Sequence, residues 1–318
     1  MRNNTSFHIG SLILINKVDS KYNLFDSLFA PLRGKAKHMI ESVKMFINNR
    51  LDKCAAVSKI LEIYAEEWFM CLGFGEKPKE RTMYRDLGRI GSNYKFVVEK
   101  FQQILKKYNL VDVIQFLDYS SSYFEGNNSE LGALGYSRDS QPSKKQLTFG
   151  ISTGMNGIPS ALTVQKGNVQ DKEHMNFMLK VVGKVLEKGS LVIFDCGGNT
   201  EDNKAKILLM ELNYLTLKQR YKGTYKKYIE LYKSSPKEVF YINGIKYKCV
   251  KVKDENVKYI FHSKKLYKKL HKTRNKRFQR DLLNGDKLLS KINKGKSIGE
   301  HISRRGSIIL RGEIQTSL

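Results

Sequence analysis

The chain has 318 residues, of which 41% are hydrophobic and 11% aromatic, and this composition is typical of a folded globular protein rather than a disordered one. Lysine and arginine number 57 against 31 aspartates and glutamates, so the formal net charge is +26. Such a charge suits a polyanionic partner better than a small metabolite, and therefore favours nucleic acid. A basic bias of the whole proteome is the alternative explanation.

The cysteines and the apolar runs exclude several other classes of protein. Cys54, Cys71, Cys196 and Cys249 lie far apart and form no CxxC pair, which argues against a structural zinc site and against a disulfide scaffold. No apolar run approaches the ~18 residues that a membrane span needs, and residues 9–15 lack the flanks of a signal peptide. We therefore expect a cytoplasmic, nucleoid-associated protein with no membrane partner.

The first 110 residues are predicted to be helical. Apolar residues recur at helical spacing in 35–48, in 54–74 and again from about residue 79 to 105. Basic outer faces of these short helices are candidates for docking on DNA, although such a face is more often simply solvated.

From residue 111 the hydrophobic period changes to that of strands. Asn156-Gly157, between two β-branched runs, is a strong hairpin signal, and Asp171 is a candidate N-cap for a following helix. The predicted elements, in chain order, are strands at 111–118, 146–152 and 158–164, a helix at 171–187, a strand at 191–194, a helix at about 202–212 and a strand at 214–217.

Two carboxylates stand at the ends of predicted strands. Asp118 closes the first strand, and Asp195 follows Leu191–Phe194, an apolar run typical of a strand covered on both faces. The right-handed crossover rule brings the Asp195 strand parallel to the first strand and beside it. We therefore expect Asp118 and Asp195 to share one site outside the carboxyl ends of the strands. The alternatives are a helix cap for Asp195 and a turn residue for Asp118.

Paired carboxylates persist when a cation lies between them. Hard divalent ions such as Mg²⁺ prefer oxygen ligands and take one or two protein carboxylates together with substrate phosphates. Two such ions ~3.5–4 Å apart would activate the attacking oxygen and stabilise the leaving oxygen of a phosphodiester displacement. The basic surface would then hold the polyanion whose phosphate occupies this site.

After residue 221 short strands and a basic helix are predicted. The strands are expected at 238–242, 246–253 and 258–261, with Asn243-Gly244 as a second hairpin turn. The Lys/Arg-rich helix that follows contains nine candidate DNA-binding residues: Lys264, Lys265, Lys268, Lys269, Lys272, Arg274, Lys276, Arg277 and Arg280.

Several motifs, in order, resemble those of prokaryotic DDE transposases of the insertion-sequence 4 type. Leu117-Asp-Tyr-Ser-Ser-Ser-Tyr-Phe124 is similar to the first-aspartate motif of that family, and Phe194-Asp-Cys-Gly-Gly-Asn-Thr-Glu-Asp-Asn203 to its second-aspartate motif. Other segments that resemble the family are Arg81–Leu87, Leu134–Asp139 with Pro142 and Lys145-Gln146, Gly157–Pro159 and Lys166–Asp171. The resemblance covers roughly residues 80 to 280.

The resemblance implies an α/β fold: an RNase H-like mixed-sheet core with a helical N-terminal region and a strand-rich basic insertion. It implies an enzyme that binds Mg²⁺ or Mn²⁺ and cuts transposon ends, after which the freed 3′-hydroxyl attacks target DNA. The partner would be double-stranded DNA, and a homodimer is an open alternative. The expected organisation is a helical, candidate DNA-binding region at 1–110, the first part of the core at 111–220, the insertion with its basic helix at 221–296, and an irregular tail at 297–318.

The resemblance also assigns roles to single residues. Asp118 and Asp195 would be the first two metal ligands. Gly167, Asn168 and Asp171 would shape a loop and cap a helix. The segment Ser137–Asp139, which includes Arg138, would lie near substrate or belong to a plain loop.

The third acidic residue of the family is where the chain departs from the pattern. In the family it is a Glu on a C-terminal helix, among Tyr, Arg and Lys at helical spacing, and neither Glu300 nor Glu313 has these neighbours. We therefore expect a C-terminally truncated copy with an incomplete active site, weaker metal binding and no strand transfer. Two other functions stay open: a non-catalytic DNA-binding protein, and an RNase H-like nuclease that hydrolyses without joining.

Overall fold

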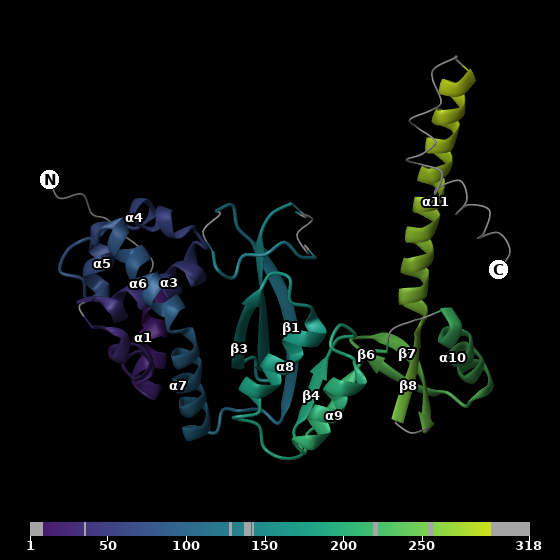
Figure 1. Ribbon diagram of the computed structural model, residues 1–318, viewed down its shortest axis with the longest axis horizontal. Helices are drawn as coiled ribbons and strands as arrows, with labels where there is room; N and C mark the ends of the chain where they lie inside the picture. Colours follow the sequence, from purple (N-terminus) through teal and green to yellow (C-terminus); the bar gives the residue numbers. More distant parts are fainter. Residues whose placement is uncertain are drawn as a thin grey trace. The chain divides into compact units, whose positions relative to one another are not determined.

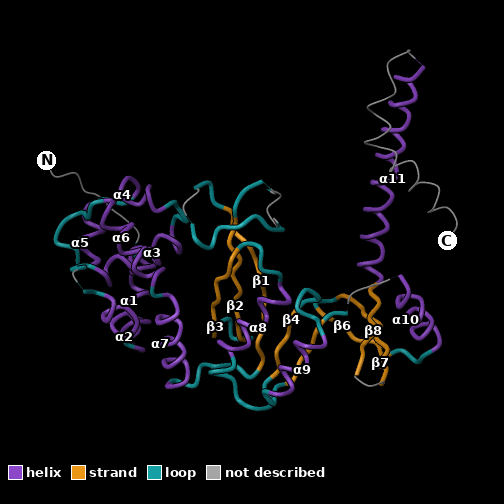
Figure 2. The backbone as a smooth tube through the Cα atoms, in the orientation of Figure 1, coloured by secondary structure: helices purple, strands orange, loops and turns teal. Residues whose placement is uncertain are grey.

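The computed structural model describes residues 9–34, 36–126, 129–136, 141, 143–218, 222–253 and 257–293. By their internal contacts the residues divide into two compact units, Met1–Gln219 and Arg220–Leu318. Figure 1 labels the helices and strands of each unit, and Figure 2 shows the same backbone coloured by secondary structure.

The N-terminal part of the first unit is helical, as predicted. Its helices are α1 (Gly10–Tyr22), α2 (Leu24–Phe29), α3 (Met39–Asp52), α4 (Ile60–Ile63), α5 (Glu66–Leu72), α6 (Glu80–Ser92) and α7 (Tyr94–Lys107), with 3-10 turns at Ala30–Leu32 and Val57–Lys59.

The segment 54–74, where apolar residues recur at helical spacing, forms two short helices rather than one. Tyr64 adopts an extended backbone (φ −98°, ψ 131°) between α4 and α5, and its hydroxyl donates a hydrogen bond to Asp52. The apolar periodicity still marks the core correctly, because Ile60, Tyr64, Trp68 and Leu72 are all buried. The pattern therefore predicted which residues are inside, while tertiary contacts decided where the helix breaks.

The centre of the first unit is a five-stranded mixed sheet, which confirms the predicted α/β fold class. The strands are β1 (Ile114–Tyr123), β2 (Gln146–Gly154), β3 (Pro159–Lys166), β4 (Leu191–Phe194) and β5 (Asn213–Thr216), in the order β3-β2-β1-β4-β5. The hairpins β1–β2 and β2–β3 are antiparallel, whereas β4 pairs in parallel with β1 and with β5. The predicted crossover that returns the fourth strand beside the first is therefore confirmed.

One face of this sheet is buried beneath helices α8 (Asp171–Val182) and α9 (Glu201–Leu209). Alternate residues of each strand point to this face, as the period of two requires. The side chains that form this core include Leu117, Tyr119, Val192, Phe194, Met175, Met178 and Ile207. Complete burial of one such side chain stabilises the fold by about 1.5–3 kcal/mol.

The opposite face of the sheet is open in the described part of the chain. Phe116 on β1 is 44% exposed and Leu215 on β5 is 49% exposed, and both side chains belong to this face. Asp118, two residues after Phe116, points to the same face and is exposed. The open face therefore leads directly to one of the predicted site residues.

Gln102 ties the helical region to the sheet within the first unit. Its buried side-chain amide donates to the carbonyl oxygen of Ser160 on β3 (2.9 Å) and to that of Val181 on α8 (3.1 Å). One α7 side chain thus satisfies two backbone acceptors on different elements.

Replacement of Gln102 by Ala should lower the free energy of unfolding by about 1–3 kcal/mol, because two carbonyl groups lose their donor. Chemical denaturation measures this change. Gln103→Ala is the matched control: Gln103 is exposed on the same helix, and its loss should change stability by no more than about 0.5 kcal/mol. Equal effects of the two substitutions would contradict the linking role of Gln102.

The second unit is a three-stranded antiparallel sheet with two helices. Its elements are α10 (Lys222–Ser234), β6 (Glu238–Ile242), β7 (Ile245–Lys253), β8 (Val257–Ser263) and α11 (Lys264–Asn293). Asn243 and Gly244 both have positive φ (48° and 72°), as the predicted Asn-Gly hairpin turn requires. The predicted basic helix is confirmed as α11.

Among the described residues, no helix is long and apolar enough to cross a membrane.

Candidate functional site

Asp118 lies on β1, and Asp195 is the first residue after the adjacent parallel strand β4. The register pairs Leu117 with Phe194, so each aspartate follows one member of this pair. Neighbouring strands lie about 4.7–4.9 Å apart, so this pairing brings the backbones of two residues far apart in sequence side by side at the carboxyl end of β4. Their role as a metal-binding pair stays a prediction.

The alternative roles of the two aspartates do not fit the structure. The N-cap of α9 is Thr200, whose hydroxyl oxygen accepts a hydrogen bond from the Asn203 backbone N–H, so Asp195 does not cap that helix. Asp118 lies inside β1, which continues to Tyr123 because β2 pairs with it over its whole length. Asp195 is therefore not the cap of α9, and Asp118 is not a turn residue.

The local hydrogen bonds leave much of each carboxylate unused. Asp118 Oδ1 accepts from the backbone N–H of Tyr119, and Asp195 Oδ1 accepts from that of Gly197, both at 2.9 Å. Thr216 on β5 donates to the carbonyl oxygen of Asp195 (3.0 Å) and anchors the end of β4. In the described part of this strongly basic chain, neither carboxylate forms an ion pair with a lysine or arginine.

Asp171 is a third carboxylate at this place, and its predicted role was wrong. Gln170 is the N-cap of α8, with extended backbone, and Asp171 is the first helical residue. A Cβ atom on Gly197 would lie 2.7 Å from Asp171 Oδ2 and 3.2 Å from Asp195 Oδ1. Both carboxylates therefore border the same glycine, and a side chain at this position would require the Asp171 carboxylate to shift.

The three carboxylates all affect the pKa of the buried Tyr119 hydroxyl. This hydroxyl donates to the sulfur of Met175 (2.9 Å) in the core beneath the sheet. Burial raises the pKa of Tyr119 well above its usual value, and the negative charges of Asp171, Asp195 and Asp118 raise it further. The phenol therefore stays neutral and adds no negative charge to the cluster.

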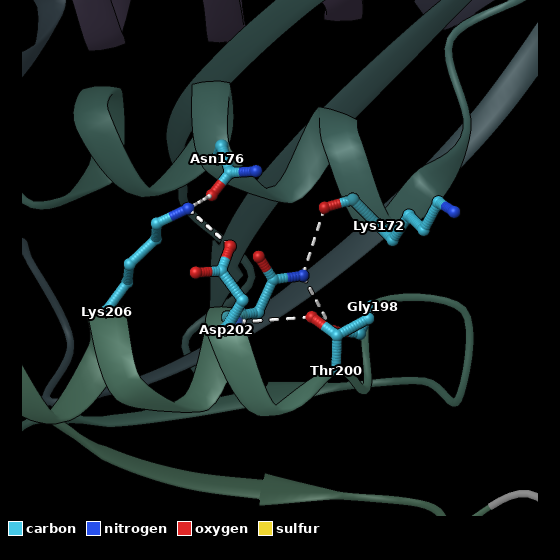
Figure 3. Close-up of polar contacts among 7 residues, drawn as sticks. Lys172, Asn176, Gly198, Thr200, Asp202 and Lys206 are labelled. Carbon is cyan, nitrogen blue, oxygen red and sulfur yellow. Dashed lines mark hydrogen bonds and ion pairs between the residues drawn. The ribbon is translucent and has the colours of Figure 1, made fainter.

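Asn203 clamps together the two segments that carry Asp171 and Asp195. Its buried side-chain amide donates to the carbonyl oxygen of Lys172 (3.0 Å) and to that of Gly198 (2.9 Å). Figure 3 shows Lys172 and Gly198 on either side of this contact, with Thr200 below it. The start of α8 and the turn after β4 are therefore held at a fixed separation.

A second contact joins helices α8 and α9 nearer the surface. Lys206 on α9 donates to Asn176 on α8 (2.8 Å) and pairs with Asp202 on its own helix (2.6 Å), as Figure 3 also shows. Because these groups are partly exposed, we expect them to contribute less than the buried Asn203 clamp.

Replacement of Asn203 by Ala should destabilise the protein by about 1–3 kcal/mol, because two carbonyl groups lose their buried donor. Thermal or chemical unfolding measures the loss. Asn199→Ala is the matched control, since Asn199 donates a single exposed hydrogen bond to Leu217 in the same region and should cost about 0.5 kcal/mol. If Asn199→Ala were as damaging as Asn203→Ala, the clamp would not be the reason.

Mg²⁺ or Mn²⁺ is the ion that the family resemblance implies, and the donor chemistry fits it. Two exposed carboxylates without basic partners are oxygen ligands of the kind that hard divalent ions prefer. Among the residues that the structure describes, no group of three or more His, Cys, Asp and Glu side chains converges closely enough to hold a metal ion. The site therefore presents Asp118 and Asp195 as possible direct ligands, with Asp171 as a neighbouring charge.

Other residues singled out from the sequence have different outcomes. Ser137, Arg138, Asp139, Glu300 and Glu313 lie outside the described residues. Gly167 shapes a loop, because a Cβ atom there would lie 1.9 Å from the carbonyl oxygen of Gln146.

The nine predicted DNA-binding residues, which all lie on α11, are exposed. At 100° per residue, Lys265, Lys268, Lys269, Lys272, Lys276 and Arg280 fall on one side of the helix. Lys264, Arg274 and Arg277 fall on the other side, which also carries the exposed apolar residues Tyr267, Leu270, Phe278, Leu282 and Leu289.

Comparison with known proteins found a likeness among solved structures. No protein-family model matches the chain, and no curated protein matches it. Among solved structures, the chain is similar to the piggyBac transposase in a cryo-EM structure of its synaptic complex with hairpin DNA. The TM-score is 0.41 at 10% sequence identity, and the match covers 78% of this chain but only 59% of the piggyBac chain.

Proposed function

We propose that the protein is a DNA transposase of the DDE type, related to the insertion-sequence 4 group, that acts on the phosphodiester bonds of insertion-sequence ends. The observation that supports this most is the parallel register of β1 and β4, which brings Asp118 and Asp195 together without a basic partner. The order of the sequence motifs supports the family, and the net charge of +26 supports a nucleic-acid substrate.

In this proposal Asp118 and Asp195 hold Mg²⁺ or Mn²⁺, which when bound would polarise a phosphate oxygen and activate the attacking hydroxyl. The chain itself orients these carboxylates. Gly197 donates its N–H to Asp195, and Asn203 keeps the following turn at a fixed distance from α8. Both aspartates are exposed, so a phosphodiester of double-stranded DNA can approach them.

Within the described residues, the proposed active site has two metal-binding aspartates. The Tyr/Arg/Glu/Lys pattern that carries the third acidic residue in the family is not found in the sequence, and the described residues form no three-carboxylate metal site. Asp171 adds negative charge beside the pair and would retain some of the attraction for a cation. With two carboxylate ligands from the described residues, we expect weak metal binding and slow cleavage.

Asp118→Asn and Asp195→Asn should each reduce Mn²⁺-dependent cleavage by about 100-fold or more, because each removes a metal ligand worth several kcal/mol. Asp171→Asn should reduce it by about 10–100-fold, as expected of a charge next to the ligands. Nicking of a labelled duplex that carries the element's ends, measured over a range of Mn²⁺ concentrations, tests all three substitutions.

Asp202→Asn is the matched control, because Asp202 is an exposed carboxylate on α9 paired with Lys206. It should leave cleavage unchanged. If the wild type binds DNA and no variant or metal changes the result, the protein is a non-catalytic DNA-binding protein. Hydrolysis without joined products favours an RNase H-like nuclease, whereas joined products favour the transposase.

We further propose that α11 binds the DNA backbone through the side that carries Lys265, Lys269 and Lys276. Each phosphate contact contributes a slope of about −0.9 to the dependence of log affinity on log salt. Replacement of these three lysines by Ala should therefore reduce the salt slope by about 3, measured by fluorescence anisotropy of a labelled duplex.

The matched control is the triple replacement of Lys264, Arg274 and Arg277 by Ala, which removes the same charge from the opposite side of the helix. This side bears the exposed apolar residues, so we expect a change in slope of about 1 or less. Equal changes for both triple variants would mean that total charge, rather than one side of α11, attracts DNA.

A further inference from the structure

We propose that one face of the β6–β8 sheet is a stacking platform for unpaired nucleotides. The face is defined by four aromatic residues, Phe240, Tyr247, Tyr259 and Phe261. This role rests on the proposed nucleic-acid partner and adds the form of nucleic acid that the second unit takes.

The strand register places the four aromatic side chains on one face. Phe240 lies directly opposite Tyr247, while Phe261 and Tyr259 lie opposite Cys249 and Lys251. Cys249 and Lys251 follow Tyr247 at intervals of two residues, and alternate residues of a strand share a face. All three strands therefore contribute rings to the same side.

The rings form a continuous row across the sheet. Phe240 stacks on Tyr247 with ring centroids 5.5 Å apart and an interplanar angle of 12°. Phe240 meets Phe261 edge to face at 5.9 Å, and Phe261 stacks on Tyr259 at 6.2 Å. Rings that hold one another in place lose little conformational entropy when a further flat group stacks on them.

The edge of this row remains open to solvent. Phe261 is 57% exposed and Tyr259 is 47% exposed, although both side chains are large and mostly apolar. Such a surface favours a partner with flat faces of its own.

Two lysines beside the rings and the net charge of +26 favour a polyanion as that partner. Of the five lysines on β6, β7 and β8, Lys251 and Lys253 share the aromatic face with Glu238, and the other three lie on the opposite face. Lys251 places its ammonium group 5.8 Å from the centre of the Tyr259 ring, and Lys253 follows on the same face. Bases supply the flat faces and phosphates the negative charge, as in other platforms that bind single strands.

Only unpaired nucleotides fit such a platform, because the bases of a duplex already stack on each other. Each base stacked on an aromatic ring contributes about 1–3 kcal/mol, which corresponds to about 5–150-fold in affinity. The lysines would serve single and double strands alike. The aromatic row should therefore govern the affinity for single strands and leave the affinity for duplexes nearly unchanged.

The test compares a labelled oligo-dT strand with a labelled duplex of the same length, each bound to the full chain and measured by fluorescence anisotropy. The double substitution of Tyr259 and Phe261 by Ala should weaken oligo-dT binding by about tenfold or more and leave duplex binding within about twofold. Tyr241→Ala is the matched control, because Tyr241 is 66% exposed on the opposite face of the same sheet. This control should change neither affinity.

A second measurement does not depend on the variants folding. Oligo-dT that contains 5-iododeoxyuridine should crosslink on irradiation to Tyr259 or Phe261 of the wild type, and not to Tyr241. Equal loss of single-strand and duplex binding in the double variant, a loss with Tyr241→Ala, or crosslinks elsewhere would overturn the platform. A wild type that binds duplex but not oligo-dT would also overturn it and leave the proposed function intact, whereas binding of neither would remove both.

Discussion

The parallel pairing of β1 with β4 is the constraint on which the candidate site depends. It pairs Leu117 with Phe194 and so makes Asp118 and Asp195 neighbours, although they lie 77 positions apart in sequence. Neighbouring carboxylates repel each other, and among the described residues neither aspartate forms an ion pair with a lysine or arginine. A basic protein that leaves this pair unneutralised has a surface suited to a hard cation together with the phosphate that the cation would bind.

The surroundings of the pair favour rigidity at the end of β4. The missing side chain of Gly197 leaves space for both Asp171 and Asp195, and Asn203 fixes the distance between the segments that carry them. Because Tyr119 is held neutral beneath the sheet, the core adds no fourth negative charge. Local backbone hydrogen bonds orient the carboxylates and leave oxygens available, which is the arrangement that a ligand-binding site requires.

In our proposals the two units carry different parts of the interaction with nucleic acid. The first unit supplies the chemistry through its carboxylates. The second offers two chemically distinct surfaces, a basic side of α11 for phosphates and an aromatic face of the β6–β8 sheet for bases. Phosphate contacts depend strongly on salt, whereas stacking on aromatic rings depends on whether the bases are paired, so the two surfaces are separable by experiment.

The sequence by itself determined the features that depend on neighbouring residues. The period-two runs, the two Asn-Gly turns and the crossover helix predicted the mixed sheet, and chain handedness then predicted the meeting of Asp118 with Asp195. Tertiary structure alone decided that the helix breaks at Tyr64 and that Asp171 lies beside Gly197 rather than at the N-cap of α8. It also decided that the four aromatic rings share one face. These features depend on contacts and strand register between segments far apart in the chain, and local periodicity carries no information about them.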